Sequence, residues 1–145
     1  MRKLFLLLSL CSLMFAESIF TVENTDNLKV YLANETDFIS QEQALDIKRT
    51  TEEKLKAVGI ELNKVDASTF MIKIQAADIE GSFAVLVHVG IGEEVLTKRK
   101  GDVKTFAWTY YQTDLIDTNK PYEDTLETIH YLVNGFIESY QEDME

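Results

Sequence analysis

Cysteine, proline and histidine are scarce in this chain of 145 residues. It has one cysteine, Cys11, one proline, Pro121, and two histidines. Cys11 lies in the predicted N-terminal leader described below, so removal of that leader excludes disulfide bonds and thiol catalysis from the rest of the chain. Repeats and Pro-rich or Gly/Ser-rich stretches are missing as well, and residues 17–145 are therefore predicted to form a single domain.

Basic residues are few in comparison with acidic ones. The chain has 14 Lys and Arg against 25 Asp and Glu, which gives a formal net charge of −11. This balance disfavours nucleic acid as a partner, because phosphates are bound by Lys and Arg. It also disfavours broad adsorption to an anionic membrane, and it is typical of a highly soluble protein.

Patterns that carry known chemistry are missing too. Neither His88 nor His130 has a second histidine or a carboxylate at the spacing of a metal site. Gly90-Ile91-Gly92 lacks the third glycine and the following helix of a dinucleotide-binding loop. Adjacent acids such as Glu93-Glu94 do not by themselves have the separation that glycoside hydrolysis requires, and no calcium-binding EF-hand loop occurs. The sequence predicts no catalytic residue, no cofactor and no metal ion.

What the sequence does have is an apolar run near its N-terminus. Arg2 and Lys3 precede the run Leu4–Phe15, which is interrupted only by two serines, and the small residue Ala16 follows. This is the layout of a secretory signal peptide. We expect cleavage after Ala16 and a periplasmic or secreted location. The leader contains two bases and no acid, so its removal would change the net charge from −11 to −13.

Two alternatives to cleavage stay open. The run could be retained as an anchor, although twelve residues are short of the roughly 20 that span a bilayer. Cys11 could instead be lipidated, but Leu10 before it is larger than the residue expected there. With the leader removed, no stable membrane span is predicted.

Apolar periodicity predicts four strands and two helices. The strands are expected at residues 28–32, 70–75, 83–96 and 103–112, and the helices at residues 40–58 and 121–140. Ser40 and Gln43 have the spacing of a capping box, and Gly59 is placed to end that helix in the left-handed conformation. Pro121 opens the second helix.

This order, β-α-β-β-β-α, predicts an α+β two-layer sandwich. We expect a four-stranded, mainly antiparallel sheet with both helices on one face, because each helix has a single apolar stripe. The position of the first strand in the sheet is left open. Gly90 and Gly92 predict a bulge or bend, residues 114–120 are expected to form a loop, and the last helix is expected to fray after Tyr140 because acids at a helix C-terminus oppose its dipole.

Two features favour binding. In the last strand Phe106, Trp108 and Tyr110 are expected on one face and Tyr111 on the other, so that one side is left for a partner unless these aromatic residues are simply core. The second feature is Lys98-Arg99-Lys100, the densest basic stretch of the chain. It could bind an anionic headgroup, a polyanion or an acidic surface, or it could be a solvated turn.

The chain resembles small exported bacterial proteins of the α+β class that have no assigned function. The shared residues are Ala57-Val58-Gly59-Ile60, Ala107-Trp108-Thr109 and the closing segment Val133-Asn134-Gly135-Phe136-Ile137-Glu138-Ser139-Tyr140. The resemblance covers most of residues 17–145. It implies export and an α+β fold, and it implies no catalytic residue.

These observations favour an exported, non-enzymatic protein that binds another envelope component or a second copy of itself. The residues predicted to carry binding are Trp108, Tyr110, Lys98, Arg99 and Lys100. A small lipid or ligand carrier with a cavity between sheet and helices is the alternative, and a hydrolase using acids or a histidine is less favoured.

Overall fold

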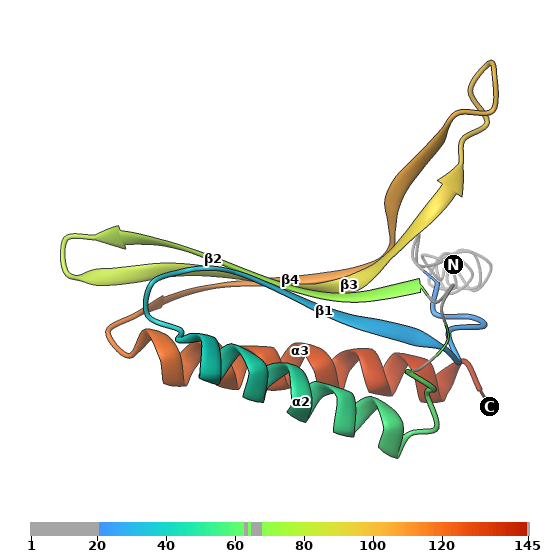
Figure 1. Cartoon of the computed structure of the whole chain (residues 1–145). Helices are drawn as coiled ribbons and strands as arrows, with labels where there is room; N and C mark the ends of the chain where they lie inside the picture. The colour runs from blue at the N-terminus through green and yellow to red at the C-terminus, as the bar shows by residue number, and fades with distance from the viewer. Residues whose placement is uncertain (1–20, 63, 65–67, 145) are drawn as a thin grey trace, which may run out of the picture.

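Four strands and two helices follow one another in the order that the sequence predicts. The computed structural model describes residues 21–62, 64 and 68–144, so the predicted leader lies outside the described residues. The elements are β1 (Leu28–Glu35), α2 (Gln41–Ala57), β2 (Ser68–Ile79), β3 (Ser82–Leu96), β4 (Lys104–Thr118) and α3 (Pro121–Glu142). Figure 1 shows the sheet as one layer and both helices as a second layer beneath it. The predicted α+β two-layer architecture is confirmed.

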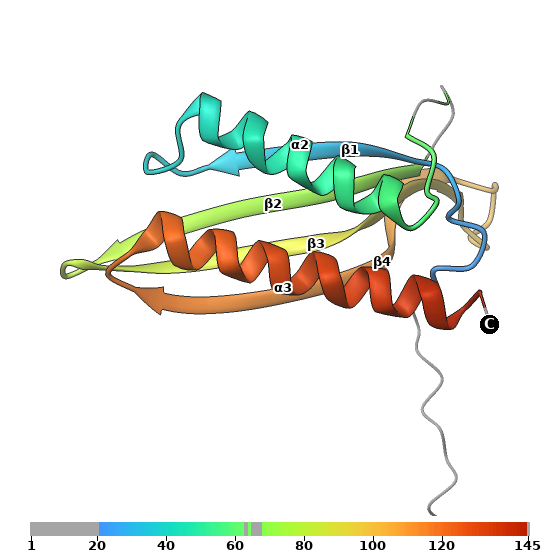
Figure 2. The same cartoon turned by 90° about the horizontal axis from the view of Figure 1, so that it is seen from below.

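The sheet is mixed, with strand order β1-β2-β3-β4. β1 pairs with β2 in parallel, whereas β2–β3 and β3–β4 pair antiparallel. A parallel pair requires a crossover connection, and α2 provides it. Figure 2 shows both helices running along the same face of the sheet; α2 packs against β1, and α3 packs against β3 and β4. Among the described residues, no helix lies over the opposite face, which is called the open face below.

Local sequence signals determine where α2 begins and ends. The Ser40 side chain accepts a hydrogen bond from the Gln43 backbone, and the Gln43 side chain in turn accepts one from the Ser40 backbone at 2.8 Å. At the other end the amide of Ile60 donates to the Leu55 carbonyl at 3.1 Å while Gly59 has a φ of 92°. These bonds satisfy helix-end groups that would otherwise lack partners.

The core lies between the helices and the facing side of the sheet. Phe70 from β2 and Tyr110 from β4 contact Phe136 of α3, with ring centroids 4.8 Å and 5.3 Å apart. The other fully buried side chains are mostly aliphatic, and the largest are Leu28, Leu55, Ile60, Ile72, Ile74, Ile91, Ile129, Val85, Val87 and Val89. Those in β2 and β3 are alternate residues of their strands, as expected for a sheet with one buried face, and Leu55 and Ile129 come from the helices.

The predicted loop at residues 114–120 is wrong over most of its length. β4 continues to Thr118, and Ile116 lies opposite Val85 while Asp114 lies opposite Val87. The segment contains Asp114 and Asp117, and aspartate is depleted in strands. The long partner strand β3 provides a continuous antiparallel ladder to Phe83, and this pairing outweighs the low strand preference of aspartate.

Candidate interaction surface

A β-bulge divides the β3–β4 hairpin into two parts. Ile91 lies opposite Tyr110 but the next residue, Gly92, lies opposite Trp108, so Thr109 is an extra residue in β4. The Thr109 carbonyl accepts a hydrogen bond from the Thr21 amide at 3.1 Å. Bulges bend and twist the strands that contain them. Beyond this one, residues 93–107 turn away from the helix layer and form the projecting arm visible in Figure 1. The bulge or bend predicted from Gly90 and Gly92 is confirmed, with the extra residue in the neighbouring strand.

The bulge changes which aromatic side chains share a face. Tyr110 points into the core and is only 6% exposed. Trp108 lies on the open face, where its ring contacts that of Tyr111 edge-on at a centroid distance of 5.4 Å. The prediction that Trp108 and Tyr110 share one face, with Tyr111 on the other, is therefore wrong. One additional residue reverses the alternation of a strand, and simple period-two counting does not include it.

Gly90 and Gly92 provide space for these rings. A Cβ atom at Gly90 would lie 2.8 Å from Trp108 Cε3 and would also collide with the Tyr110 carbonyl oxygen. A Cβ atom at Gly92 would collide with the end of the Phe106 ring. Both glycines lie inside β3 rather than in a phosphate-binding loop. Their lack of a side chain lets the aromatic rings of β4 pack over the strand.

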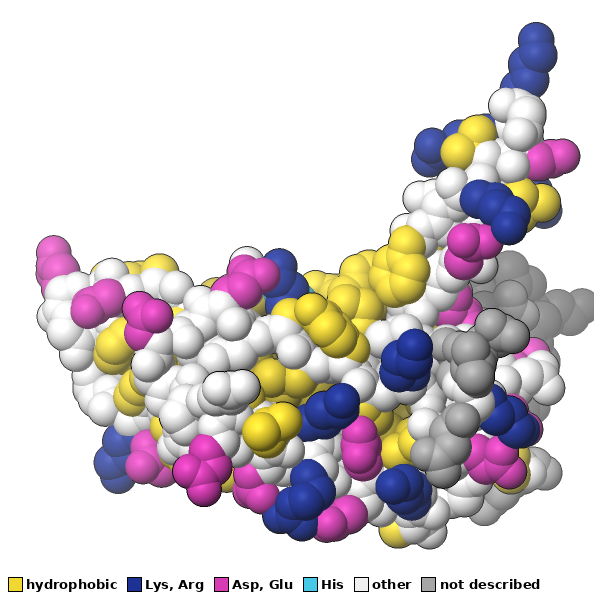
Figure 3. Space-filling model, in the orientation of Figure 1, with side chains coloured by type: hydrophobic (Ala, Val, Ile, Leu, Met, Phe, Trp, Pro, Cys, Tyr) yellow, Lys and Arg dark blue, Asp and Glu magenta, His cyan; other side chains and the backbone are white. Residues whose placement is uncertain are grey.

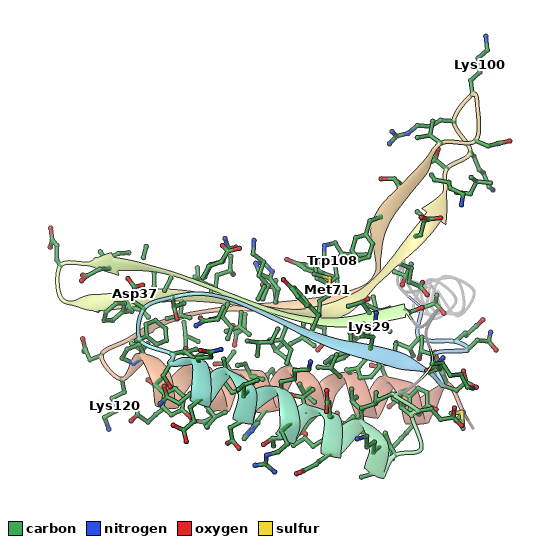
Figure 4. All side chains as sticks on the ribbon, viewed as in Figure 1. Lys29, Asp37, Met71, Lys100, Trp108 and Lys120 are labelled. Atoms are coloured by element: carbon green, nitrogen blue, oxygen red, sulfur yellow. The ribbon has the colours of Figure 1, made fainter. Side chains whose placement is uncertain are left out.

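Together these residues form one aromatic patch, defined by Tyr31, Met71, Phe106, Trp108 and Tyr111. Tyr31 of β1 lies opposite Met71, Met71 lies opposite Gly90, and Gly90 lies opposite Tyr111, so the patch crosses all four strands. Phe106 is 56% exposed and Tyr31 is 53% exposed. Figure 3 shows hydrophobic side chains gathered where the sheet meets the arm, and Figure 4 shows Met71 and Trp108 on the side away from the helices.

A histidine supports the patch from the adjoining row. The hydroxyl of Tyr111 is hydrogen-bonded to Nδ1 of His88, and the two rings lie 5.5 Å apart. Burial, and to a lesser extent the nearby Lys73, lowers the pKa of His88 below its ordinary value. The imidazole is therefore neutral at physiological pH and holds the Tyr111 ring in place.

The charges that flank the patch are largely paired. Lys73 Nζ lies 3.1 Å from Glu35 Oε1, and Lys104 Nζ lies 2.8 Å from Glu94 Oε1. The Glu35 pKa is lowered by its hydrogen bonds to Lys73 and Gln75. Exposed pairs of this kind add little to stability, but they leave this face nearly neutral in a strongly acidic chain.

The basic stretch lies at the end of the arm. Lys98, Arg99 and Lys100, here called the basic tip, are all exposed in the β3–β4 turn, and Figure 4 shows Lys100 at its far end. Gly101 and Asp102 have φ values of 95° and 47°, which close the turn. Among the described residues, the ion pairs do not include these three side chains, whereas the neighbouring Lys104 pairs with Glu94. The arm thus carries two sites, with the aromatic patch at its base and the basic tip at its end.

Two clefts in the described residues lie at the margins of the sandwich. One of about 560 Å³ is lined at one end of the molecule by residues that include Val22, Val58 and Tyr140. Another of about 470 Å³ lies beside β4 and α3, between Gln112 and Tyr131. The space between the sheet and the helices is occupied by the core side chains. This packing gives no support to the alternative of an internal ligand carrier.

The second histidine, His130, lies in α3. His130 has a pKa lowered mainly by burial and further by Lys54. In residues 21–62, 64 and 68–144, no group of three His, Cys, Asp or Glu side chains is arranged to hold a metal ion. Neither helix in this part of the chain is both long and apolar enough to cross a bilayer.

No protein-family model matches the chain, and neither does any curated protein. Sequence patterns predicted Trp108 and the basic tip as binding residues, but they did not indicate that Tyr31 and Met71 join them. The one local indication of this surface was the pair of glycines in β3, because strand glycines leave room for large side chains of a neighbouring strand.

Proposed function

We propose that this protein is an exported, non-enzymatic binding module that docks onto another envelope component through its aromatic patch. The observation that supports this proposal is a row of large side chains that crosses the open face of the sheet. The apolar run of the leader supports export to the periplasm or beyond.

The composition of the patch favours a protein partner. Tyr, Trp, Phe and Met are the residues enriched at the centres of protein interfaces, where they supply large contact areas at low conformational cost. Gly90 and Gly92 leave room for Trp108 and Phe106 to lie against the strand, and His88 is hydrogen-bonded to the Tyr111 hydroxyl. The rings are thus positioned before a partner arrives, which lowers the entropy lost on binding.

The shape of the patch also favours a protein partner. Sites for small ligands are concave and enclose most of the ligand surface. The aromatic patch extends over four strands and adjoins the base of the arm (Figure 3). An extended surface of this kind suits another protein or a second copy of this chain.

Photo-crosslinking from two exposed tyrosines tests the proposal. A photoreactive phenylalanine analogue is placed at Tyr31 in the patch or at Tyr131 on α3, which is 71% exposed and far from the open face. We expect a specific adduct from position 31 in an exporting host and none from position 131. The adduct should disappear when Trp108→Ser is combined with the probe at position 31.

The mass of the adduct identifies the partner class. A heavier species containing a second protein supports the proposal, and an adduct of twice the protein's own mass identifies the partner as a second copy. Equal labelling from positions 31 and 131, or no labelling from either, would contradict it.

A further inference from the structure

The arm carries a second site that the aromatic patch does not explain. The basic tip, Lys98, Arg99 and Lys100, protrudes at its end, followed by Asp102, so residues 98–102 have a local net charge of +2. The amide of Thr97 donates to the Val103 carbonyl at 3.0 Å, which keeps the two strands paired up to the turn. The tip is therefore a convex loop on a paired stem.

Apolar side chains flank the basic tip on both strands. Leu96, just before the turn, is 60% exposed, and Val103, just after it, is 46% exposed. Exposed apolar residues beside Lys and Arg are the combination found in segments that dock at a bilayer surface, where apolar groups enter the headgroup boundary and basic groups bind anionic lipids.

The arm also separates the tip from the acids of the body. α3 has five acidic residues and no Lys or Arg, and it lies on the far side of the sheet from the arm. At about 3.4 Å per strand residue, the tip stands about 15–20 Å beyond Gly92. Screening in physiological salt acts over about 8 Å. A negative surface that approaches the tip is therefore largely shielded from the repulsion of the body.

We propose that the basic tip with Leu96 and Val103 is a peripheral docking point for an anionic lipid bilayer. A convex loop has no hollow in which to seat a folded acidic partner, whereas a headgroup layer deforms around a protrusion. The excess of acids on the body limits the contact to the tip, so the arm provides a point contact rather than broad adsorption.

Vesicle flotation of the exported protein tests this proposal. Vesicles of phosphatidylcholine with about one third phosphatidylglycerol are compared with pure phosphatidylcholine. Each basic side chain near such a surface contributes about a fivefold gain in partitioning. We expect binding to the anionic vesicles alone, weakened by salt, and a loss of tenfold or more in the triple variant Lys98→Gln, Arg99→Gln, Lys100→Gln.

Two matched variants test whether binding depends on the position of the basic residues and on the apolar residues beside them, or only on the net charge of the protein. Lys48→Gln, Lys56→Gln and Lys64→Gln remove the same three charges from other parts of the chain, and binding should be retained. Leu96→Ser with Val103→Ser keeps the charge and should weaken binding severalfold. All variants have the same N-terminus, so the leader contributes equally to each.

Three outcomes would overturn the proposal. One is the absence of binding to anionic vesicles. Another is an equal loss in the two triple variants, because that result would reflect net charge alone. The third is binding of the tip to polyglutamate without binding to vesicles, which would identify an acidic polypeptide as the partner. None of these outcomes bears on the aromatic patch, which has its own crosslinking test.

Discussion

Trp108 and Tyr110 are two residues apart in the same strand, yet they lie on opposite faces of the sheet. The extra residue Thr109 between them reverses the alternation. Tyr110 contacts Phe136 in the core, and Trp108 contacts Tyr111 on the open face. One aromatic residue therefore belongs to the core, whereas the other belongs to the proposed binding surface.

Alanine substitutions at these two positions should separate stability from binding. Tyr110→Ala removes a buried ring and should lower the free energy of unfolding by about 3–5 kcal/mol. Trp108→Ala removes a ring that rests on Gly90 at the surface and should cost about 1–2 kcal/mol. Urea denaturation measures both values. A larger loss for Trp108→Ala than for Tyr110→Ala would place Trp108 in the core and remove it from the candidate surface.

The two glycines of β3 should respond differently to an added methyl group. Gly90→Ala forces its Cβ against the Tyr110 carbonyl, which is backbone, so we expect a cost of about 1–3 kcal/mol. Gly92→Ala meets only the end of the exposed Phe106 ring and the Met71 sulfur, which can move aside, and should cost less than about 1 kcal/mol.

A double variant provides the control for this pair. Phe106→Ala should relieve the remaining cost of Gly92→Ala, whereas Trp108→Ala should not rescue Gly90→Ala, because the carbonyl stays in place. Thermal melts of the single and double variants give the coupling between the sites. Full rescue of Gly90→Ala by Trp108→Ala would contradict this prediction, because it would show that the clash with the Trp108 ring, and not with the Tyr110 carbonyl, accounts for the whole cost.

Stability should fall as the solution is acidified through the titration of the histidines. Burial and Lys73 lower the folded-state pKa of His88 below the ordinary value of 6.5, and burial and Lys54 do the same for His130. The unfolded chain therefore takes up protons that the folded chain resists. The loss of stability caused by the two histidines is therefore absent above about pH 6.5 and grows as the pH falls toward their folded-state pKa values.

NMR titration of the imidazoles and denaturation at several pH values test this prediction. Lys73→Gln should raise the pKa of His88, but not to 6.5, because burial is the larger cause of the shift. His88→Gln should reduce the loss of stability in mild acid. An imidazole pKa at or above 6.5 in the folded protein would contradict the prediction.

The end of α3 should be the least stable part of that helix. The helix extends to Glu142, and its last turn has no basic residue, so the acids there oppose the helix dipole. We expect amides after Tyr140 to exchange quickly. Glu142→Lys should slow that exchange and add about 0.3–1 kcal/mol of local stability. Strong protection of these amides in the unaltered chain would show that the prediction is wrong.

Sequence patterns predicted the fold where local signals and tertiary packing agree. Ser40, Gln43 and Gly59 give α2 its ends, and the apolar stripes place both helices on one face. The parallel position of β1 could not be predicted, because it depends on which strand edge α2 covers. Sequence patterns missed residues 113–118 at the end of β4, which contain two aspartates and are kept in the strand by their pairing with β3.

The candidate site was predicted only in part, because its composition also depends on how the strands pair. The glycines of β3 indicated a bulge, and Trp108 and the basic tip were singled out by residue type. No local signal placed the extra residue at Thr109, so Tyr110 was predicted to share a face with Trp108. Tyr31 and Met71 belong to the patch because of the register between three pairs of strands. Periodicity within a single strand gives no information on that register.

Trp108 is the only tryptophan of the chain, so a fluorine label on it reports on the aromatic patch alone. The ¹⁹F NMR signal of protein labelled with 5-fluorotryptophan is recorded while unlabelled envelope extract is added. We predict that the signal shifts or broadens, that Tyr31→Ser prevents this change, and that Tyr131→Ser does not. A signal that stays unchanged, or one that responds equally in both variants, would contradict the assignment of the open face as the binding surface.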